Sequence, residues 1–187
     1  MKKRIKIQGF LIFLAVIALI FGAKYLLPSS SERASLNMLF LLGITLVLCG
    51  YFFRIIARGY KADLNPDGKT LVTQGPYALT RNPMYFGTLL IGLGVILAIF
   101  QWWVGLVFLL IYLAIYIPQI NKEEKVLMER FGIAFKNYCQ STPKYFPNIF
   151  AKQRIRLKLP WIKKELSSLL STLAFILIVK LWENLKW

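Results

Sequence analysis

The chain contains two apolar runs that a soluble domain of this size would not need, at residues 9–22 and 36–53. A helix requires about 20 mostly apolar residues to cross the hydrocarbon core of a bilayer, which is roughly 30 Å thick. Of the 187 residues, 57% are hydrophobic and only 17% are charged. The sequence therefore predicts an all-α fold, a polytopic bundle of membrane-spanning helices.

Five segments have the apolar character of membrane crossings: residues 7–27, 36–57, 84–100, 103–120 and 166–182. The third and fourth are short and almost contiguous, so a helical hairpin that enters the bilayer and returns is an alternative to two full crossings. The chain has no internal repeat or low-complexity linker, and we interpret residues 1–187 as one domain. A polar motif core occupies residues 71–147, and an additional C-terminal helix is expected at residues 160–184.

The first apolar segment follows four basic residues, as in a secretory signal peptide. Because no small-x-small cleavage site follows it and four more apolar segments do, we expect this helix to be retained. If the N-terminus, the loop 54–83 and the segment 121–165 share one side, that side carries 20 of the 24 Lys and Arg residues. The positive-inside rule then predicts a cytoplasmic N-terminus and, with five crossings, a C-terminus outside.

The net charge of +16 is explained by this topology together with attraction to anionic lipid headgroups, and requires no nucleic acid. Histidine is absent, which removes the commonest general base and the commonest metal ligand. The two cysteines, Cys49 and Cys139, are expected on different levels of the protein, so a disulfide is not predicted. No metal site is expected from this composition.

Polar features concentrate between the apolar segments. Residues 59–76 form a predicted loop with a turn at residues 65–68. Residues 122–140 combine charges with apolar side chains at helical spacing, which predicts a cytoplasmic amphipathic helix lying along the membrane.

The junction at residues 75–87 joins a turn-forming loop to an apolar helix. Asn82 is suited to cap this helix and Pro83 to its first position, and Arg81 is suited to an interfacial anchor. These structural roles are one interpretation. The alternative is a ligand site, because a helix start presents free N–H groups to an anion and Arg81 offers a bidentate partner for a carboxylate.

Two adjacent carboxylates, Glu123 and Glu124, stand at the end of the fourth apolar segment. A solvated face balanced by Lys122 and Lys125 is one interpretation. A carboxylate at a membrane boundary is otherwise a functional hypothesis. Neighbouring helical residues point about 100° apart, so we expect one glutamate to face a ligand and the other to orient its neighbours. Glu124 is preferred for the ligand, because its helical stripe is the more apolar one.

Together the two motifs resemble the isoprenylcysteine carboxyl methyltransferase and phospholipid methyltransferase family of membrane enzymes. The first half of the pattern is supplied by Gly75, Pro76, Tyr77, Arg81, Pro83, Tyr85 and Gly87. The second half is supplied by Glu123, Glu124, Leu127, Phe131, Gly132, Tyr138, Pro143 and Pro147. Asn82 stands where many relatives carry histidine, which favours the broader bacterial and archaeal group over the prenylcysteine branch.

The resemblance implies transfer of a methyl group from S-adenosylmethionine to a lipophilic or small acceptor (a carboxylate, amine or thiol) at the cytoplasmic face of a prokaryotic plasma (inner) membrane. It implies catalytic roles for Arg81 and Glu124. The implied cofactor-binding residues are Gly75, Pro76, Tyr77, Arg81, Asn82, Pro83, Tyr85, Gly87, Glu123, Glu124 and Tyr138. Two alternatives remain from the sequence: an NAD(P)H-dependent membrane reductase related to sterol reductases, and a non-enzymatic membrane scaffold.

Overall fold

The computed structural model describes residues 33–185 apart from 149, 152 and 154, so the predicted crossing at residues 7–27 lies outside the described residues. The described helices are α2 (Arg33–Leu64), α3 (Pro76–Leu79), α4 (Pro83–Ile99), α5 (Trp102–Ser141) and α6 (Leu159–Leu185). This part of the chain contains no strand. The predicted all-helical class is therefore confirmed for the described residues.

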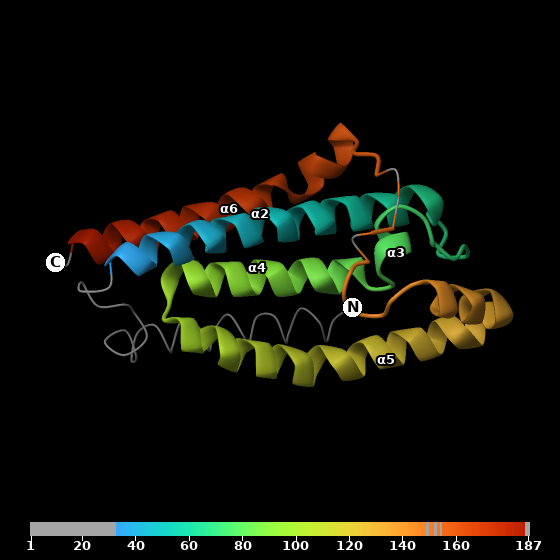
Figure 1. Ribbon diagram of the computed structural model, residues 1–187. Coiled ribbons are helices and arrows are strands. Elements are labelled where there is room, and N and C mark those ends of the chain that lie inside the picture. Colours follow the sequence, from blue (N-terminus) through green and yellow to red (C-terminus); the bar gives the residue numbers. More distant parts are fainter. Residues whose placement is uncertain (1–32, 149, 152, 154, 186–187) are drawn as a thin grey trace.

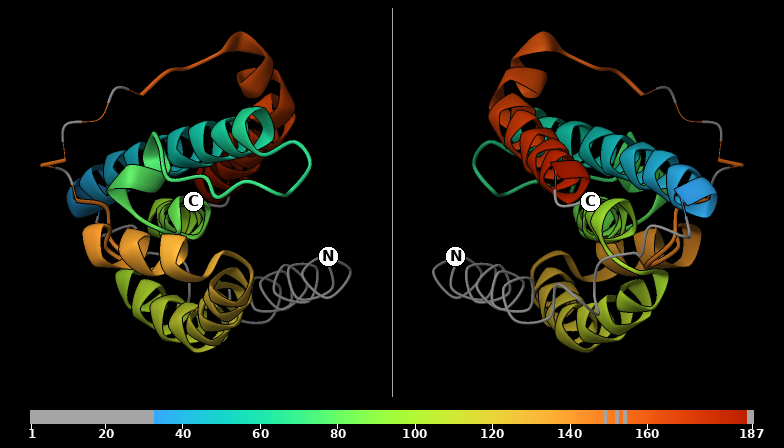
Figure 2. Two further views of the ribbon diagram at one scale, coloured as in Figure 1. Left: turned by 90° about the vertical axis from the view of Figure 1, so that its right-hand side faces the viewer. Right: turned by 90° about the vertical axis from the view of Figure 1, so that its left-hand side faces the viewer.

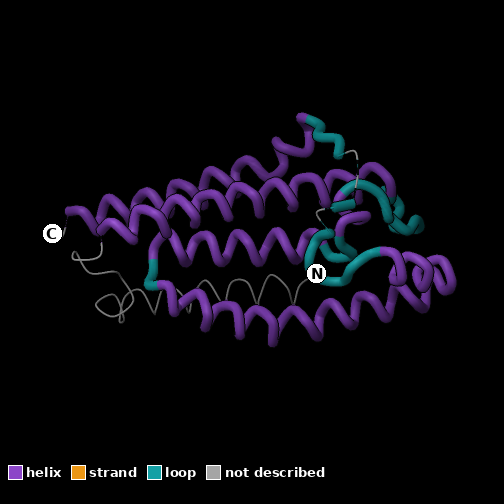
Figure 3. Tube along the Cα trace, in the orientation of Figure 1, coloured by secondary structure: helices purple, strands orange, loops and turns teal. Residues whose placement is uncertain are grey.

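The four long helices lie side by side, with α6 beside α2, α4 against α2, and α5 along the other side of α4 (Figures 1 and 2). The loop after α2, helix α3 and the start of α4 gather at one end of this bundle (Figure 3). The second half of α5 reaches the same end. The polar residues singled out in the sequence therefore come from segments that meet there.

Three of these helices contain stretches that are long and apolar enough to span a membrane: Met38–Leu64, Trp102–Ser141 and Leu159–Trp182. Helix α4 is apolar but has only 17 residues, or about 25 Å at 1.5 Å per residue, which is less than a hydrocarbon core of roughly 30 Å. The structure thus supports an integral membrane protein with three candidate spans among its described residues, and leaves the predicted number of five as a prediction.

Helix α5 corrects two predicted boundaries. The helix predicted to end at residue 120 runs on without a break to Gly132, and a second helical piece of α5 continues from there to Ser141. Lys and Glu are good helix formers, so the charges after residue 120 do not stop the helix. The first break comes at Gly132, whose φ of 50° lies in the region that favours glycine. The separation into two helices was therefore predicted ten residues too early.

Helix α2 also extends further than predicted, to Leu64, and takes up the first residues of the loop expected from residue 59. It ends where Asn65 precedes Pro66, because a residue before proline disfavours the helical conformation. The predicted turn is confirmed: the amide of Gly68 donates a hydrogen bond to the carbonyl oxygen of Asn65 at 3.3 Å.

Glycines set the close approach of α2 and α4. A Cβ atom placed on Gly87 would lie 2.6 Å from the carbonyl oxygen of Gly50, and one on Gly94 would lie 2.5 Å from that of Gly43. Small residues let helix backbones pack closely in a lipid environment, where packing rather than the hydrophobic effect drives association. Two glycine pairs therefore fix α4 against α2 and determine where the start of α4 is held.

Helix α6 is attached to α2 through polar side chains. The buried carboxylate of Glu165 forms ion pairs with Arg58 and, at 3.6 Å, with Arg54. The hydroxyl of Tyr51 donates to the carbonyl oxygen of Ser168 at 2.9 Å. A buried carboxylate is costly unless it is paired, so these contacts favour one position of α6 on α2.

Candidate functional site

Gly75 begins the site segment, and its conformation requires glycine. Its φ is 61°, and a Cβ atom at this position would lie 2.5 Å from the ring of Tyr60. Buried Pro76 then occupies the start of α3. This short helix carries Tyr77 and ends at the segment that leads into α4.

Residues 142–148, which follow α5, cover the short segment between α3 and α4. We call residues 142–148 the strap. The backbone amide of Arg81 donates to the carbonyl oxygen of Pro143 at 2.9 Å, and the backbone amide of Asn148 donates to the carbonyl oxygen of Leu79 at 2.8 Å. Fully buried Thr80 also donates its hydroxyl hydrogen to the carbonyl oxygen of Lys144 at 3.3 Å. The strap therefore forms one wall of the site.

Asn82 precedes α4, but its side chain does not cap the helix. Its backbone oxygen accepts from the amides of Tyr85 and Phe86, whereas its Nδ2 atom donates to Glu124 Oε1 at 3.3 Å and to the carbonyl oxygen of Lys144 at 3.0 Å. Asn82 is therefore the N-cap residue of α4, as predicted, but its side chain makes no capping hydrogen bond. Pro83 does occupy the first turn, as predicted. The amide group of Asn82 joins α4, α5 and the strap.

Glu124 is the charged centre of the site. Its Oε2 atom lies 3.0 Å from Lys144 Nζ, and its Oε1 atom lies 3.6 Å from Arg81 Nε. The side chains of Arg81 and Glu124 are only 13% and 14% exposed. Among the described residues, Arg81 Nε is buried and has no hydrogen-bond partner. One carboxylate thus faces two cations, and the buried Nε atom of Arg81 lies close enough to it for an ion pair but makes no hydrogen bond within the described residues.

Glu123 has different neighbours. Its Oε1 atom accepts from the hydroxyl of Tyr85 at 2.6 Å and from Gln119 Nε2 at 3.0 Å. The hydroxyl of Tyr112 donates to the backbone oxygen of Tyr85 at 2.7 Å, and its ring stacks on Tyr116 with centroids 4.2 Å apart. The two glutamates therefore differ as their helical positions predict: Glu124 faces the charged site, and Glu123 is held in a tyrosine cluster between α4 and α5.

Tyr77 and Tyr138 form a third group, in which the hydroxyl of Tyr138 donates to the backbone oxygen of Tyr77 at 2.5 Å. Burial, and then the nearby carboxylate of Glu123, raise the pKa of Tyr77 above its usual value, so its phenol stays protonated. This contact holds the part of α5 beyond Gly132 against α3.

The structure therefore distributes the predicted site residues over several places. Arg81, Asn82 and Glu124 meet directly, Tyr85 and Glu123 lie beside them, and Gly87 faces Gly50 in the helix interface. Lys144 was missed by sequence reasoning. In the sequence, Lys144 is marked only by its place directly after Pro143, which belongs to the family-like pattern. Its pairing with Glu124 could not be predicted, because the two residues are distant in the chain.

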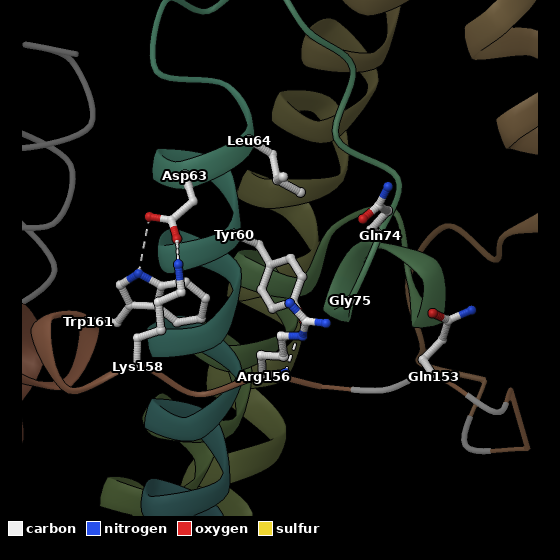
Figure 4. Close-up of a pocket in the computed structure, with 9 residues that line it drawn as sticks. All are labelled: Tyr60, Asp63, Leu64, Gln74, Gly75, Gln153, Arg156, Lys158 and Trp161. Atoms are coloured by element: carbon white, nitrogen blue, oxygen red, sulfur yellow. Dashed lines mark hydrogen bonds and ion pairs between the residues drawn. The ribbon is translucent and has the colours of Figure 1, made fainter.

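A cavity of about 370 Å³ lies away from Glu124 (Figure 4). It opens between the end of α2 and the chain that leads into α6. Gly75 is the one predicted site residue that lines it. The structure thus has a charged cluster at the start of α4 and a separate cavity at the opposite end of α3.

These features define a class: a helical membrane protein that holds a cluster of partly buried charges at one end of its bundle. A sequence profile of the phospholipid methyltransferase family matches residues 34–134, more than half of the chain. The chain belongs to this family, and is a membrane methyltransferase by that membership. Searches of curated proteins and of solved structures gave no significant match.

Proposed function

We propose that this protein transfers a methyl group from S-adenosylmethionine to a lipophilic or small acceptor, and that the cofactor binds at Arg81, Asn82 and Glu124. The observation that carries the proposal is the meeting of these three side chains at the start of α4. All three lie inside the range that matches the methyltransferase family. Membership of this family favours methyl transfer over the reductase alternative.

The side chains at this position are chemically suited to the amino-acid end of the cofactor. The buried Nε atom of Arg81 lies 3.6 Å from Glu124 and makes no hydrogen bond within the described residues, so its donor suits the carboxylate of a ligand. Glu124 Oε2 forms an ion pair with Lys144 Nζ at 3.0 Å, and the ammonium group of the cofactor has the same charge and the same kind of donors. Cofactor binding would then displace Lys144 from Glu124.

The remaining predicted residues support this position. Pro76 and Pro83 fix the two ends of the segment, and Tyr138 holds Tyr77 and α3 in place. Tyr85 and Glu123 hold α4 against α5. We assign these residues to the walls of the cofactor site, with Arg81 and Glu124 as the residues that contact the cofactor.

S-adenosylmethionine supplies a methyl group bound to a positively charged sulfur. The acceptor atom forms a bond to that carbon while the carbon–sulfur bond breaks, which leaves S-adenosylhomocysteine. The protein's contribution is alignment of the two reactants and exclusion of water. An acceptor carboxylate needs no base, whereas an amine or thiol must lose a proton to Glu124, to a tyrosine or to solvent.

Calorimetry of the purified protein tests the cofactor. We expect S-adenosylmethionine and S-adenosylhomocysteine to bind and NADPH not to bind. Binding of NADPH alone would favour the reductase, and binding of none of the three would favour the non-enzymatic scaffold. Lipid profiling of cells with and without the protein would then identify the acceptor as a carboxylate, amine or thiol compound.

We further propose that this site faces the cytoplasm of a prokaryotic cell, with the protein in its plasma (inner) membrane and its N-terminus inside. The distribution of Lys and Arg supports this orientation. Reporter fusions after Lys6, Lys69, Lys136 and Trp187 test it. We expect the first three reporters inside and the last outside. A cytoplasmic reporter at Trp187 would contradict the model of five crossings.

A further inference from the structure

The cavity of about 370 Å³ lies apart from the charged cluster at Glu124 and has its own chemistry (Figure 4). Its volume falls within the range of small-molecule sites, roughly 300–1,000 Å³. It is lined by Tyr60, Asp63, Leu64, Gln74, Gly75, Gln153, Arg156, Lys158 and Trp161. The lining contains one carboxylate, two cations, two side-chain amides and two aromatic rings, so it is a polar cavity.

The single carboxylate is already neutralised. Asp63 Oδ2 accepts from Lys158 Nζ at 2.6 Å, and Asp63 Oδ1 accepts from Trp161 Nε1 at 3.3 Å (Figure 4). Lys158 Nζ also lies 5.4 Å from the centroid of the Trp161 ring. The cavity therefore offers no free negative charge to attract a cation.

The second cation has no such partner. The backbone amide of Arg156 donates to the hydroxyl of Tyr60 at 3.0 Å, which places its side chain beside the ring (Figure 4). No carboxylate among the described residues forms an ion pair with its exposed guanidinium group. The amides of Gln74 and Gln153 lie across the cavity. The lining thus carries one unpaired positive charge and neutral donors, which suits an anion.

The position of the cavity identifies the source of that anion. It lies where the candidate span Met38–Leu64 ends and the candidate span Leu159–Trp182 begins. Trp161 lies at the start of the second span, and tryptophan is enriched at the level of lipid headgroups. Phosphate groups are the anions present at this level of a bilayer, and arginine matches their geometry with two parallel donors.

We propose that this cavity binds the phosphate-bearing headgroup of an anionic phospholipid, with Arg156 as the phosphate ligand. Arg156, Lys158 and Trp161 lie outside residues 34–134, so the phosphate ligand comes from a part of the chain that the family match does not include, whereas the facing wall lies inside it. Gly75 belongs to both the cavity and the loop before α3. A bound headgroup would therefore contact the segment that leads to Arg81. The proposal does not depend on the methyltransferase activity.

The test uses the full-length protein in nanodiscs of phosphatidylcholine with and without 20% phosphatidylglycerol. We expect phosphatidylglycerol to raise the thermal unfolding temperature and to remain bound in native mass spectrometry. Arg156→Gln should weaken retention of the lipid by about tenfold or more, the scale of a lost hydrogen bond to a charged group. Arg130→Gln is the matched control, because it removes another exposed arginine, from α5. It should leave retention unchanged.

Equal losses in the two variants would overturn the proposal, since they would show a general effect of charge. No preference for phosphatidylglycerol would also overturn it. A further measurement separates the sources of phosphate: soluble glycerophosphoglycerol and inorganic phosphate are added to the protein in phosphatidylcholine nanodiscs. We expect only weak stabilisation by either one. Strong stabilisation by inorganic phosphate that Arg156→Gln abolishes would overturn the lipid assignment in favour of a soluble phosphate ligand.

Discussion

The substitution Glu124→Gln gives the sharpest test of the proposed cofactor site. The carboxylate of Glu124 faces Lys144 Nζ at 3.0 Å, Asn82 Nδ2 at 3.3 Å and Arg81 Nε at 3.6 Å. Glutamine keeps the shape of the side chain and an acceptor oxygen for Asn82, but removes the charge. The variant therefore isolates the negative charge as the feature that would hold the ammonium group of the cofactor.

The expected magnitude follows from the exposure of the site. A hydrogen bond to a charged group contributes about 1.5–3 kcal/mol. Because Glu124 is 14% exposed, solvent screens part of this, and we expect a loss of about 1.5–2 kcal/mol in cofactor binding. That free energy corresponds to a Kd about 10- to 30-fold higher. Removing the charge also leaves Lys144 and Arg81 without their counter-ion, so the unfolding temperature must be measured in parallel.

The neighbouring glutamate provides the comparison. Glu123→Gln keeps an acceptor for the hydroxyl of Tyr85 and for Gln119, so we expect its Kd to change by less than about threefold, within the scale of an exposed ion pair. Glu129→Gln, an exposed change on the same helix, is the control for lost charge. The assay is calorimetry with S-adenosylhomocysteine. Equal losses in the two adjacent variants, or a loss confined to Glu123→Gln, would refute the assignment.

Three further predictions follow from the same geometry. Arg81→Ala should weaken cofactor binding by about 1.5–3 kcal/mol in calorimetry, and Arg81→Lys should restore only part of it because the planar fork is lost; normal binding by both folded variants would make Arg81 an interfacial anchor. Lys144→Gln should strengthen binding about two- to fivefold, because it removes the ammonium group that occupies Glu124; weaker binding would show that Lys144 assists the ligand. Gly87→Ala should lower the free energy of unfolding by about 1–3 kcal/mol in denaturant titration, since its Cβ would meet a backbone oxygen at 2.6 Å. Gly105→Ala, whose Cβ would meet its nearest atom at 3.8 Å, should be close to neutral.

Much of this geometry follows from local sequence. Hydrophobic length predicted the long helices, and the predicted C-terminal helix at residues 160–184 is observed at Leu159–Leu185. Helix periodicity predicted that Glu123 and Glu124 would point to different neighbours, and they do. These properties depend on residues within a few turns of one another. The helix positions and the directions of these side chains can therefore be predicted from the sequence alone.

The features that were missed depend on contacts between distant segments. The side chain of Asn82 satisfies the sequence rule for a helix cap, yet it donates to Glu124 and to the strap instead. The break in α5 is a different case, because it comes from the local backbone conformation of Gly132 and not from the charges after residue 120. The ion pairs of Glu165 with α2 have no local signal, because arginine at a membrane boundary is equally suited to lipid phosphate.

The chain beyond the family match supplies the counter-charges for carboxylates within it. Lys144 pairs with Glu124 at 3.0 Å, and Lys158 pairs with Asp63 at 2.6 Å. Both acidic residues lie within residues 34–134, and both lysines lie after them. A carboxylate near a membrane is costly without a partner, and a lysine can leave it when a ligand brings its own ammonium group. The C-terminal part of this chain therefore supplies cations to the charged end of the bundle, and under the proposed function Lys144 is the group that the cofactor's ammonium would replace at Glu124.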